Sequence, residues 1–196
     1  MSKLKNPNAL FYLETGLFFA TIFIRPAAKL PRRIGHSFPN LWDGALTAEE
    51  RRYGLLPGDG ALAESIAHEY GAFARMAKTK AAPAGLLLAM AHMGSRGNEQ
   101  AVSSHGAQGL MQLTPEVTAR FKIDAKNPDQ AVSVGALLLT ELQVRYPDDF
   151  AYVLLAWMQG TAMADKTKRQ HRNDTKLHAL AGYVQALGRL YEEILK

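Results

Sequence analysis

One loop collects polar groups in a pattern that is typical of a chemical site. From Ser103 to Leu113 the chain alternates glycines with serine, histidine and glutamine, and this stretch follows the apolar run Ala84–Met93. A loop of this composition beside buried helices often lines a cleft, because its short polar side chains and its backbone stay accessible to a ligand. We therefore expect a binding or catalytic site here.

Several kinds of site are excluded or disfavoured by residue type. The chain has no cysteine, which excludes disulfides, thiolate zinc, iron–sulfur clusters and a cysteine nucleophile. His92 and His105 have no acidic partner at helical spacing, and His68-Glu69 lacks the second histidine of a zinc protease motif. We therefore expect no metal site and no cofactor.

The octapeptide Gly106–Leu113 reads Gly-Ala-Gln-Gly-Leu-Met-Gln-Leu and resembles the GAxGLMQL signature of soluble-type lytic transglycosylases (SLT), relatives of goose-type lysozyme. Supporting matches lie upstream and downstream of it: Asn98, Ala101-Val102-Ser103, Asn127-Pro128, Gly135-Ala136 and Tyr183-Val184. The resemblance covers roughly residues 60 to 196. It implies an all-α, lysozyme-like helical domain.

The resemblance implies a reaction and a position for its acid. The family cleaves the β-1,4 bond between N-acetylmuramic acid and N-acetylglucosamine in peptidoglycan, using one glutamic acid, and leaves 1,6-anhydro ends. Such cleavage needs a carboxyl group with a raised pKa to protonate the leaving oxygen. By the family's spacing, that position is Gly94, which has no proton to give. Glu99, five residues later in the loop, is a weak substitute candidate because loop geometry differs from a helix end.

Two further positions depart from the family pattern. Met158 stands where the family has a polar asparagine, and Ala179 where a glutamate usually precedes the Tyr-Val pair. The resemblance assigns substrate contacts to the residues that are retained: Ser95, Ser103, Met111, Gln112, Trp157 and Tyr183. Taken without the resemblance, Trp157 and Tyr183 would be core residues and Gly94 would end a helix in the left-handed conformation.

The elements that must position these residues are helices. No alternating apolar pattern exceeds four residues, whereas apolar spacing of three and four recurs along the chain. Capping signals and periodicity predict helices starting at Thr47, over 61–78 and 84–93, after Thr114-Pro115, over 128–145, after Asp149 and over 177–195. The basic run Lys166 to Arg172 is expected to be a solvated loop.

The N-terminal part has a different composition. Ala9 to Ile24 is apolar but only 16 residues long and contains Glu14. A membrane-associated or signal-anchor segment, an ordinary core or docking helix, and a cleaved signal all remain open. We divide the chain into an apolar segment 1–25, an irregular linker 26–58 rich in proline and glycine, and a helical domain 59–196.

Charge and resemblance together give a functional hypothesis. The formal net charge of +5 suits an anionic polymer, but no helix concentrates Lys and Arg with base-reading residues, so nucleic acid is not expected. We expect a protein that engages the glycan strand of peptidoglycan, inactive or strongly impaired in cleavage because of Gly94. The alternative is a non-catalytic helical interaction or scaffold protein of an envelope assembly. The expected location is the bacterial cell envelope or periplasm, with membrane contact through residues 9–24 as one option and the cytoplasm as another.

Overall fold

Eight helices make up almost all regular structure in the computed structural model, which describes residues 46–170 and 175–196. They are α2 (Ala48–Tyr53), α3 (Asp59–Ala77), α4 (Ala84–Ser95), α5 (Pro115–Phe121), α6 (Pro128–Arg145), α7 (Phe150–Gln159), α8 (Thr161–Arg169) and α9 (Thr175–Ile194). Within the described ranges there is no β-strand, only two isolated bridges in the loop after α4. The all-α prediction is therefore confirmed, whereas the apolar segment 9–24 lies outside the described residues.

Local sequence signals place most helix starts. Thr47 and Glu50 form the expected capping box at α2, and the Asn127 side chain accepts a hydrogen bond from the Gln130 N–H at α6. The Asp149 side chain likewise accepts from the Ala151 N–H at α7. These contacts satisfy N–H groups that have no partner within the helix. Helix α2 packs on α9 and α3, so the folded unit includes residues before 59.

The end of α4 differs from the sequence prediction. The helix continues past Met93 to Ser95, so Gly94 is a helical residue rather than a left-handed terminator. The left-handed residue is Arg96, at φ 52°, and its N–H donates to the carbonyl oxygen of His92. The glycine that helps to reverse the chain is Gly97, at φ 79°, where a Cβ would lie 2.8 Å from Ile66 Cγ1. The expectation that Gly94 would end the helix in the left-handed conformation was therefore wrong.

The basic run after α7 was also predicted incorrectly. Residues up to Arg169 form α8, which follows α7 after a single residue, Gly160, at φ 84°. The run lacks helix breakers, and its lysines and arginine have good helix propensity. Asp165 adds a tertiary contact, because its carboxylate accepts hydrogen bonds from Arg145 Nη2 at 2.5 Å and from the Tyr146 hydroxyl at 2.7 Å.

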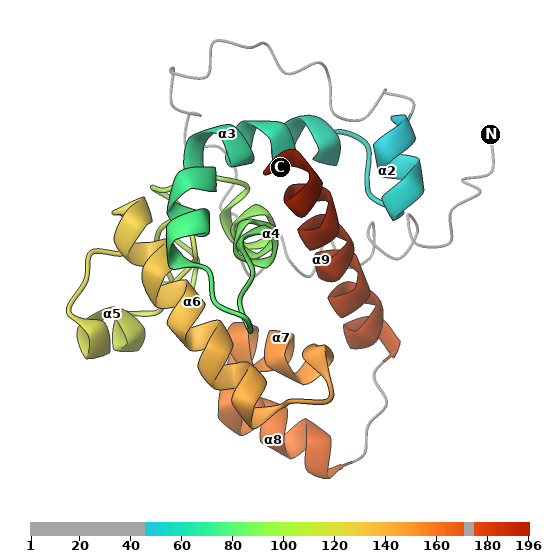
Figure 1. The fold of residues 1–196 in the computed structure, drawn as a ribbon. Helices are drawn as coiled ribbons and strands as arrows, with labels where there is room; N and C mark the ends of the chain where they lie inside the picture. The colour runs from blue at the N-terminus through green and yellow to red at the C-terminus, as the bar shows by residue number, and fades with distance from the viewer. Residues whose placement is uncertain (1–45, 171–174) are drawn as a thin grey trace.

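Helix α4 lies at the centre of the fold. Figure 1 shows it end-on, with α3, α6, α7 and α9 around it. Its side chains are buried on most sides, as its apolar composition predicted. Helices α4 and α9 cross closely. A Cβ built on Gly85 would lie only 2.3 Å from the carbonyl oxygen of Gly188. Glycines at this crossing allow the two helix backbones to approach each other. The close contact with α9 sets the position of α4, and with it the position of the loop that follows α4.

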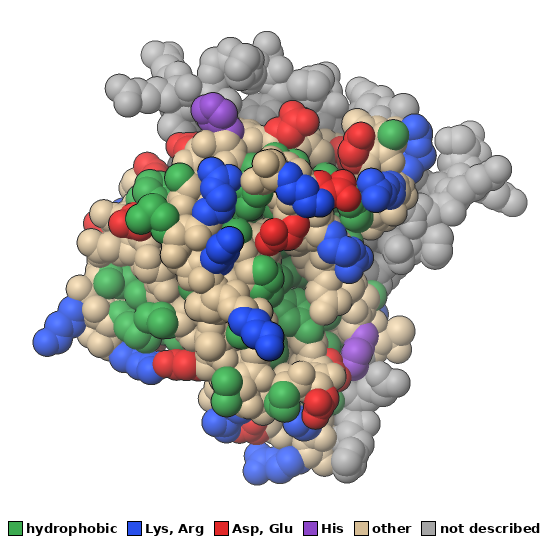
Figure 2. All heavy atoms as spheres, in the orientation of Figure 1, with side chains coloured by type: hydrophobic (Ala, Val, Ile, Leu, Met, Phe, Trp, Pro, Cys, Tyr) green, Lys and Arg blue, Asp and Glu red, His purple; other side chains and the backbone are tan. Residues whose placement is uncertain are grey.

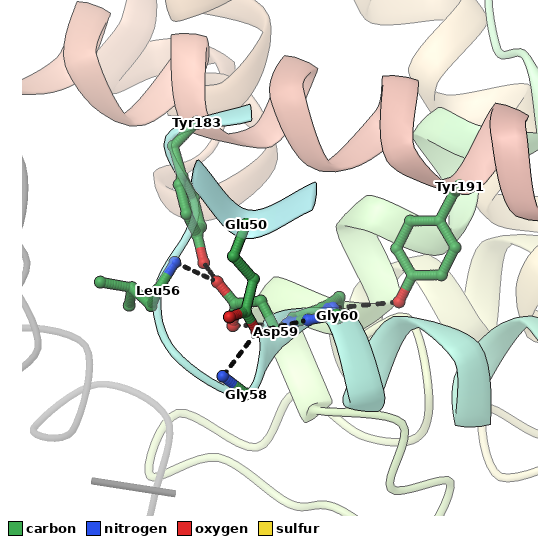
Figure 3. Close-up of polar contacts among 8 residues, drawn as sticks. Glu50, Leu56, Gly58, Asp59, Gly60, Tyr183 and Tyr191 are labelled. Carbon is green, nitrogen blue, oxygen red and sulfur yellow. Dashed lines mark hydrogen bonds and ion pairs between the residues drawn. The ribbon is translucent and has the colours of Figure 1, made fainter. Parts of the chain in front are cut away.

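A buried polar network holds the last turns of α4 (Figure 3). His92 Nε2 lies 3.3 Å from Asp59 Oδ1 at the start of α3, and its Nδ1 lies 3.0 Å from the Tyr191 hydroxyl of α9. The Tyr183 hydroxyl and the Leu56 N–H donate to the other Asp59 oxygen. Burial lowers the pKa of His92, so the ring is neutral. Burial alone would raise the pKa of Asp59, but its hydrogen bond with His92 brings it below its usual value.

A second buried carboxylate ties α2 to the same region. Glu50 is 1% exposed and accepts hydrogen bonds from the N–H groups of Gly58 at 2.7 Å and Gly60 at 3.1 Å with one oxygen. Its other oxygen accepts from the Thr47 N–H at 2.8 Å. Figure 3 shows Glu50 beside Asp59, at the turn that leads into α3. Two satisfied carboxylates therefore fix the start of α3 against α4 and α9.

The neutral, buried state of His92 predicts a pH-dependent stability. Because burial lowers the pKa of His92, the unfolded chain binds more protons than the folded chain between pH 7 and pH 5, so the free energy of unfolding falls, by at most about 2 kcal/mol from this group. His92→Gln should remove most of that fall, measured by urea unfolding at the two pH values. The exposed His68→Gln is the control and should leave the pH dependence unchanged. An equal pH dependence in His92→Gln and the unmodified chain would contradict a neutral His92.

Left-handed backbone at non-glycine residues predicts a second effect. Arg96→Gly removes the Cβ that makes φ 52° unfavourable, and it should raise the free energy of unfolding by about 0.5–1 kcal/mol. Lys122→Gly, at φ 53° after α5, should raise the free energy of unfolding by a similar amount for the same reason. Gly97→Ala should lower the free energy of unfolding, because its φ is positive and Ile66 blocks the Cβ. Urea denaturation of the three variants at pH 7 measures these changes, and a loss of stability in Arg96→Gly would contradict the argument.

Candidate functional site

A groove of about 590 Å³ opens where α4 ends. It is bordered by the end of α4, the loop after it, the start of α5, the second half of α7 and one face of α9. The groove residues are Met90, Met93, Gly94, Ser103, His105, Ala107, Gln112, Thr114, Glu116, Val117, Leu154, Ala156, Trp157, Met158, Gln159, Gly160, Leu180 and Val184. Its size is within the usual range for a ligand site.

Gly94 leaves one position of the groove wall without a side chain. It lies in the last turn of α4, and a Cβ built on it would lie 3.3 Å from Gln112 Cγ and 3.6 Å from Gln112 Cβ. Its backbone is helical, which any residue can adopt. A Cβ at position 94 would therefore lie beside Gln112, and to admit that atom the Gln112 side chain has to shift by a few tenths of an ångström.

Gln112 presents a fixed and unpaired acceptor. The residue is 7% exposed and adopts the left-handed conformation at φ 49°. Its Nε2 group donates to the carbonyl oxygens of Gly109 at 2.9 Å and Ala101 at 3.3 Å, so the amide orientation is set by two acceptors. Its Oε1 atom is buried and has no hydrogen-bond partner among the described residues. A buried acceptor without a partner is costly, and a ligand that donates an N–H or O–H would satisfy it.

The loop that carries Gln112 is held by its own hydrogen bonds. Gln108 and Leu113 exchange backbone N–H to O=C bonds, each 2.9 Å long, and Ser103 Oγ accepts from the Ala107 N–H at 3.0 Å. Gly109, at φ 75°, lies so close to the 125–126 backbone that a Cβ would be 1.7 Å from the Ala125 carbonyl oxygen. Close packing therefore requires glycine at 109, whereas at Gly106 the positive φ of 81° favours glycine and a Cβ would meet no atom closer than 3.6 Å. The loop is consequently a defined wall of the groove.

The opposite wall is apolar. Trp157 and Met158 of α7 are partly buried, and with Met90, Met93 and Leu180 they present hydrocarbon and sulfur to the groove. Met111 lies beneath this surface, 1% exposed, with its Cε 2.6 Å from where a Gly135 Cβ would be. The glycine at 135 therefore makes room for Met111, and Trp157 Cη2 lies 3.6 Å from the same point.

One carboxylate lines the groove within the described residues, and it is Glu116. It is exposed in the first turn of α5, where a hydrogen bond from Thr114 lowers its pKa. It is therefore ionised at neutral pH and cannot donate a proton as a general acid must. Glu116 was not among the residues predicted from the sequence to form the site. The helix start Thr114-Pro115-Glu116 directly after the motif was the available signal, because it places this side chain beside the loop.

The structure brings some of the predicted site residues together and not others. Gly94, Ser103, Gln112 and Trp157 line the groove, as do Met158 and His105. Ser95 and Met111 do not, because Ser95 Oγ donates to the Ala91 carbonyl oxygen at 3.0 Å and Met111 is buried. Tyr183 is buried, and its hydroxyl donates to Asp59, so its α9 neighbours Leu180 and Val184 face the groove instead.

Glu99, the substitute acid candidate, lies away from the groove residues. Its negative charge acts on Tyr70 of α3, whose pKa burial raises and the carboxylates of Glu69 and Glu99 raise further. The Tyr70 hydroxyl donates to the Gly97 carbonyl oxygen at 3.2 Å, which places this part of the loop against α3. The geometry therefore offers no proton donor from Glu99 to a ligand in the groove.

No group of three or more His, Asp or Glu side chains among the described residues is arranged to hold a metal ion. No described helix has both the length and the apolar character needed to cross a membrane.

Comparisons with known proteins identify a matching family and two relatives. A family model described as the transglycosylase SLT domain matches residues 71–180. Membrane-bound lytic murein transglycosylase F 1 of Alkalilimnicola ehrlichii is 32% identical over 96 residues, which is 48% of this chain and 17% of that protein. Membrane-bound lytic murein transglycosylase F of Maricaulis maris is 41% identical over 64 residues, 32% of this chain and 14% of that protein.

In both cases the match spans less than a fifth of the relative's length. The family match begins inside α3 and ends within α9, so it contains all of the loop and every groove residue except Val184. Since it covers more than half of the 196 residues, this chain belongs to the transglycosylase SLT domain family.

Proposed function

We propose that this chain binds the glycan strand of peptidoglycan in the groove and has little or no cleaving activity. The observation that carries this proposal is Gly94, a residue without a side chain in the groove wall at the position where the family resemblance expects the acid. The relatives are named as murein transglycosylases, which supports murein as the polymer and the cell envelope as the location.

The absence of cleavage follows from the chemistry of the bond. A glycosidic oxygen is a poor leaving group unless a carboxylic acid protonates it as the bond breaks. The groove carboxylate, Glu116, has a lowered pKa and is ionised, and Glu99 is not among the residues that line the groove. Loss of a positioned general acid lowers a rate by about 10²- to 10⁴-fold. We therefore expect turnover at that reduced level or below it.

The groove keeps features that suit sugar binding. An N-acetyl sugar offers an amide N–H and hydroxyl groups, any of which can donate to the unpaired Gln112 Oε1. Its C–H faces and acetyl methyl group suit a wall formed by Trp157 and methionines. One fixed acceptor opposite an apolar wall would orient such a ring without any acid present.

A second candidate function rests on the apolar side of the groove. Met158 of α7, with Met90 and Met93 of α4, makes this side adaptable, as in surfaces that bind protein segments. In that case the chain would be a helical interaction protein of an envelope assembly. Protein docking should survive the loss of Gln112 Oε1, whereas glycan binding should not.

Restoring a carboxyl group at position 94 tests the proposed lack of an acid. Gly94→Glu should keep the fold, because the backbone is helical and glutamate has the higher helix propensity. It should release soluble 1,6-anhydro muropeptides from murein at least about 100-fold faster than the unmodified chain, measured by mass spectrometry. Gly94→Gln, equal in size but without an acid, is the matched control and should stay inactive. Equal activity of the unmodified chain and Gly94→Glu would show that another group supplies the proton.

Binding is tested separately from cleavage. Trp157→Ala and Gln112→Ala should each weaken cosedimentation with purified murein, by about five- to tenfold in apparent Kd, since each removes one side of the groove. Val144→Ala, on the exposed side of α6, is the control and should bind as the unmodified chain does. If the unmodified chain binds murein and neither groove variant weakens that binding, the polymer binds outside the groove. Docking of a protein segment would then be the better-supported function of the groove.

A further inference from the structure

The groove reaches the molecular surface at Gly160, between α7 and α8. Gln159 and Gly160 line it and are exposed, and apart from the neighbouring residues no atom lies within 4 Å of a Cβ built on Gly160. Helix α8 starts at the next residue and has one buried side chain, that of Ala164. A ligand that extends out of the groove at this end would therefore pass over the exposed surface of α8.

That surface is basic. Lys166, Lys168 and Arg169 occupy the last turn of α8, and all three are exposed. Figure 2 shows Lys and Arg side chains at the lower edge of the molecule, over α8. The one acid of the helix, Asp165, is already paired with Arg145 and Tyr146. The net charge that α8 offers to a ligand is therefore positive.

The three cations differ in orientation. Lys168 Nζ lies 5.6 Å from the Tyr146 ring centre and 6.0 Å from that of Tyr152, so its side chain packs over these two rings. Lys166 and Arg169 are three residues apart and lie on a shared face, which also contains Ala162 in the first turn. Among the described residues neither of these two has a carboxylate within 4 Å, although the charge of Arg169 contributes to lowering the pKa of Asp165 on the same helix. They form a pair of cations directed towards solvent.

We propose that Lys166 and Arg169 bind carboxylates of the peptide stems that project from the glycan strand, an inference that rests on the proposed glycan binding in the groove. The two residues follow Gly160 by six and nine positions, which along a helix is about 9 and 14 Å. An extended peptide reaches the same distances in about three to four residues. A stem attached to a sugar at the Gly160 end of the groove would bring its carboxylates to these cations, so peptide-bearing murein would bind more tightly than bare glycan.

The test compares two forms of soluble murein strand, released from the sacculus by an endopeptidase that cuts only the cross-links, in a titration that measures the Kd of the full chain. One form is intact, and the other has been treated with an amidase that removes the stem peptides. We expect the unmodified chain to bind the intact form about three- to tenfold more tightly, with the difference decreasing at high salt. Lys166→Gln combined with Arg169→Gln should lower the affinity for intact murein to that for the stripped form. It should leave binding to the stripped form unchanged.

The control removes two positive charges at the other end of the molecule. The control variant combines Arg51→Gln on α2 with Arg189→Gln on α9, and both residues are exposed. In Figure 1, α2 and the C-terminal end of α9 lie at the opposite end of the molecule from α8. This control should retain the preference for intact murein. Circular dichroism of both double variants should show unchanged helix content, because glutamine is also a good helix former.

The outcomes separate this inference from the proposed function. If the unmodified chain binds both forms equally, or the α8 variant keeps the preference, the stem-binding inference is overturned and groove binding stands. If the chain binds neither form, the proposed function itself fails. If the variant instead loses binding to phosphatidylglycerol vesicles while the two mureins bind alike, the basic face contacts an anionic lipid surface and the inference is overturned.

Discussion

The placement of the α4 C-terminal end is the constraint on which the groove depends. The buried His92 ring lies between two partners, with Nε2 3.3 Å from Asp59 Oδ1 and Nδ1 3.0 Å from the Tyr191 hydroxyl. His92 is two residues before Gly94 in the sequence. Asp59 in turn is fixed by the Leu56 N–H and the Tyr183 hydroxyl. Because each polar atom of this network has a partner, the last turn of α4 cannot rotate without leaving a buried charge unpaired. The wall that contains Gly94 is rigid for that reason.

This network also explains why Tyr183 is not in the groove. The family resemblance predicted that Tyr183 contacts the substrate. Its α9 neighbours Leu180 and Val184 line the groove. The tyrosine ring is nonetheless turned towards Asp59, where a buried carboxylate needs donors. Its role in this chain is thus to satisfy Asp59, and through Asp59 to fix His92.

The sequence was sufficient for features with a local cause. Capping at Thr47, Asn127 and Asp149 predicted three helix starts, and apolar periodicity predicted the long helices. The left-handed end of α4 was misplaced because Arg96, a residue that rarely adopts this conformation, takes the role expected of a glycine. The α8 helix was missed because part of what holds it is the contact of Asp165 with Arg145 and Tyr146, which are distant in sequence. The contact between Asp59 and His92 could not be predicted either, because the sequence around each residue gives no sign that the other lies next to it in the fold.

The energetics of Gln112 favour a ligand in this groove whether or not any bond is cleaved. Its left-handed backbone costs about 1 kcal/mol, and its unpaired buried Oε1 costs about 1–3 kcal/mol more. Two hydrogen bonds from Nε2 prevent the amide from turning to relieve that cost. A side chain at position 94 would lie against Gln112, but glycine leaves the space open. In the proposed complex, a sugar N–H or O–H that reaches Oε1 through a small movement of the Gln112 side chain would offset this cost.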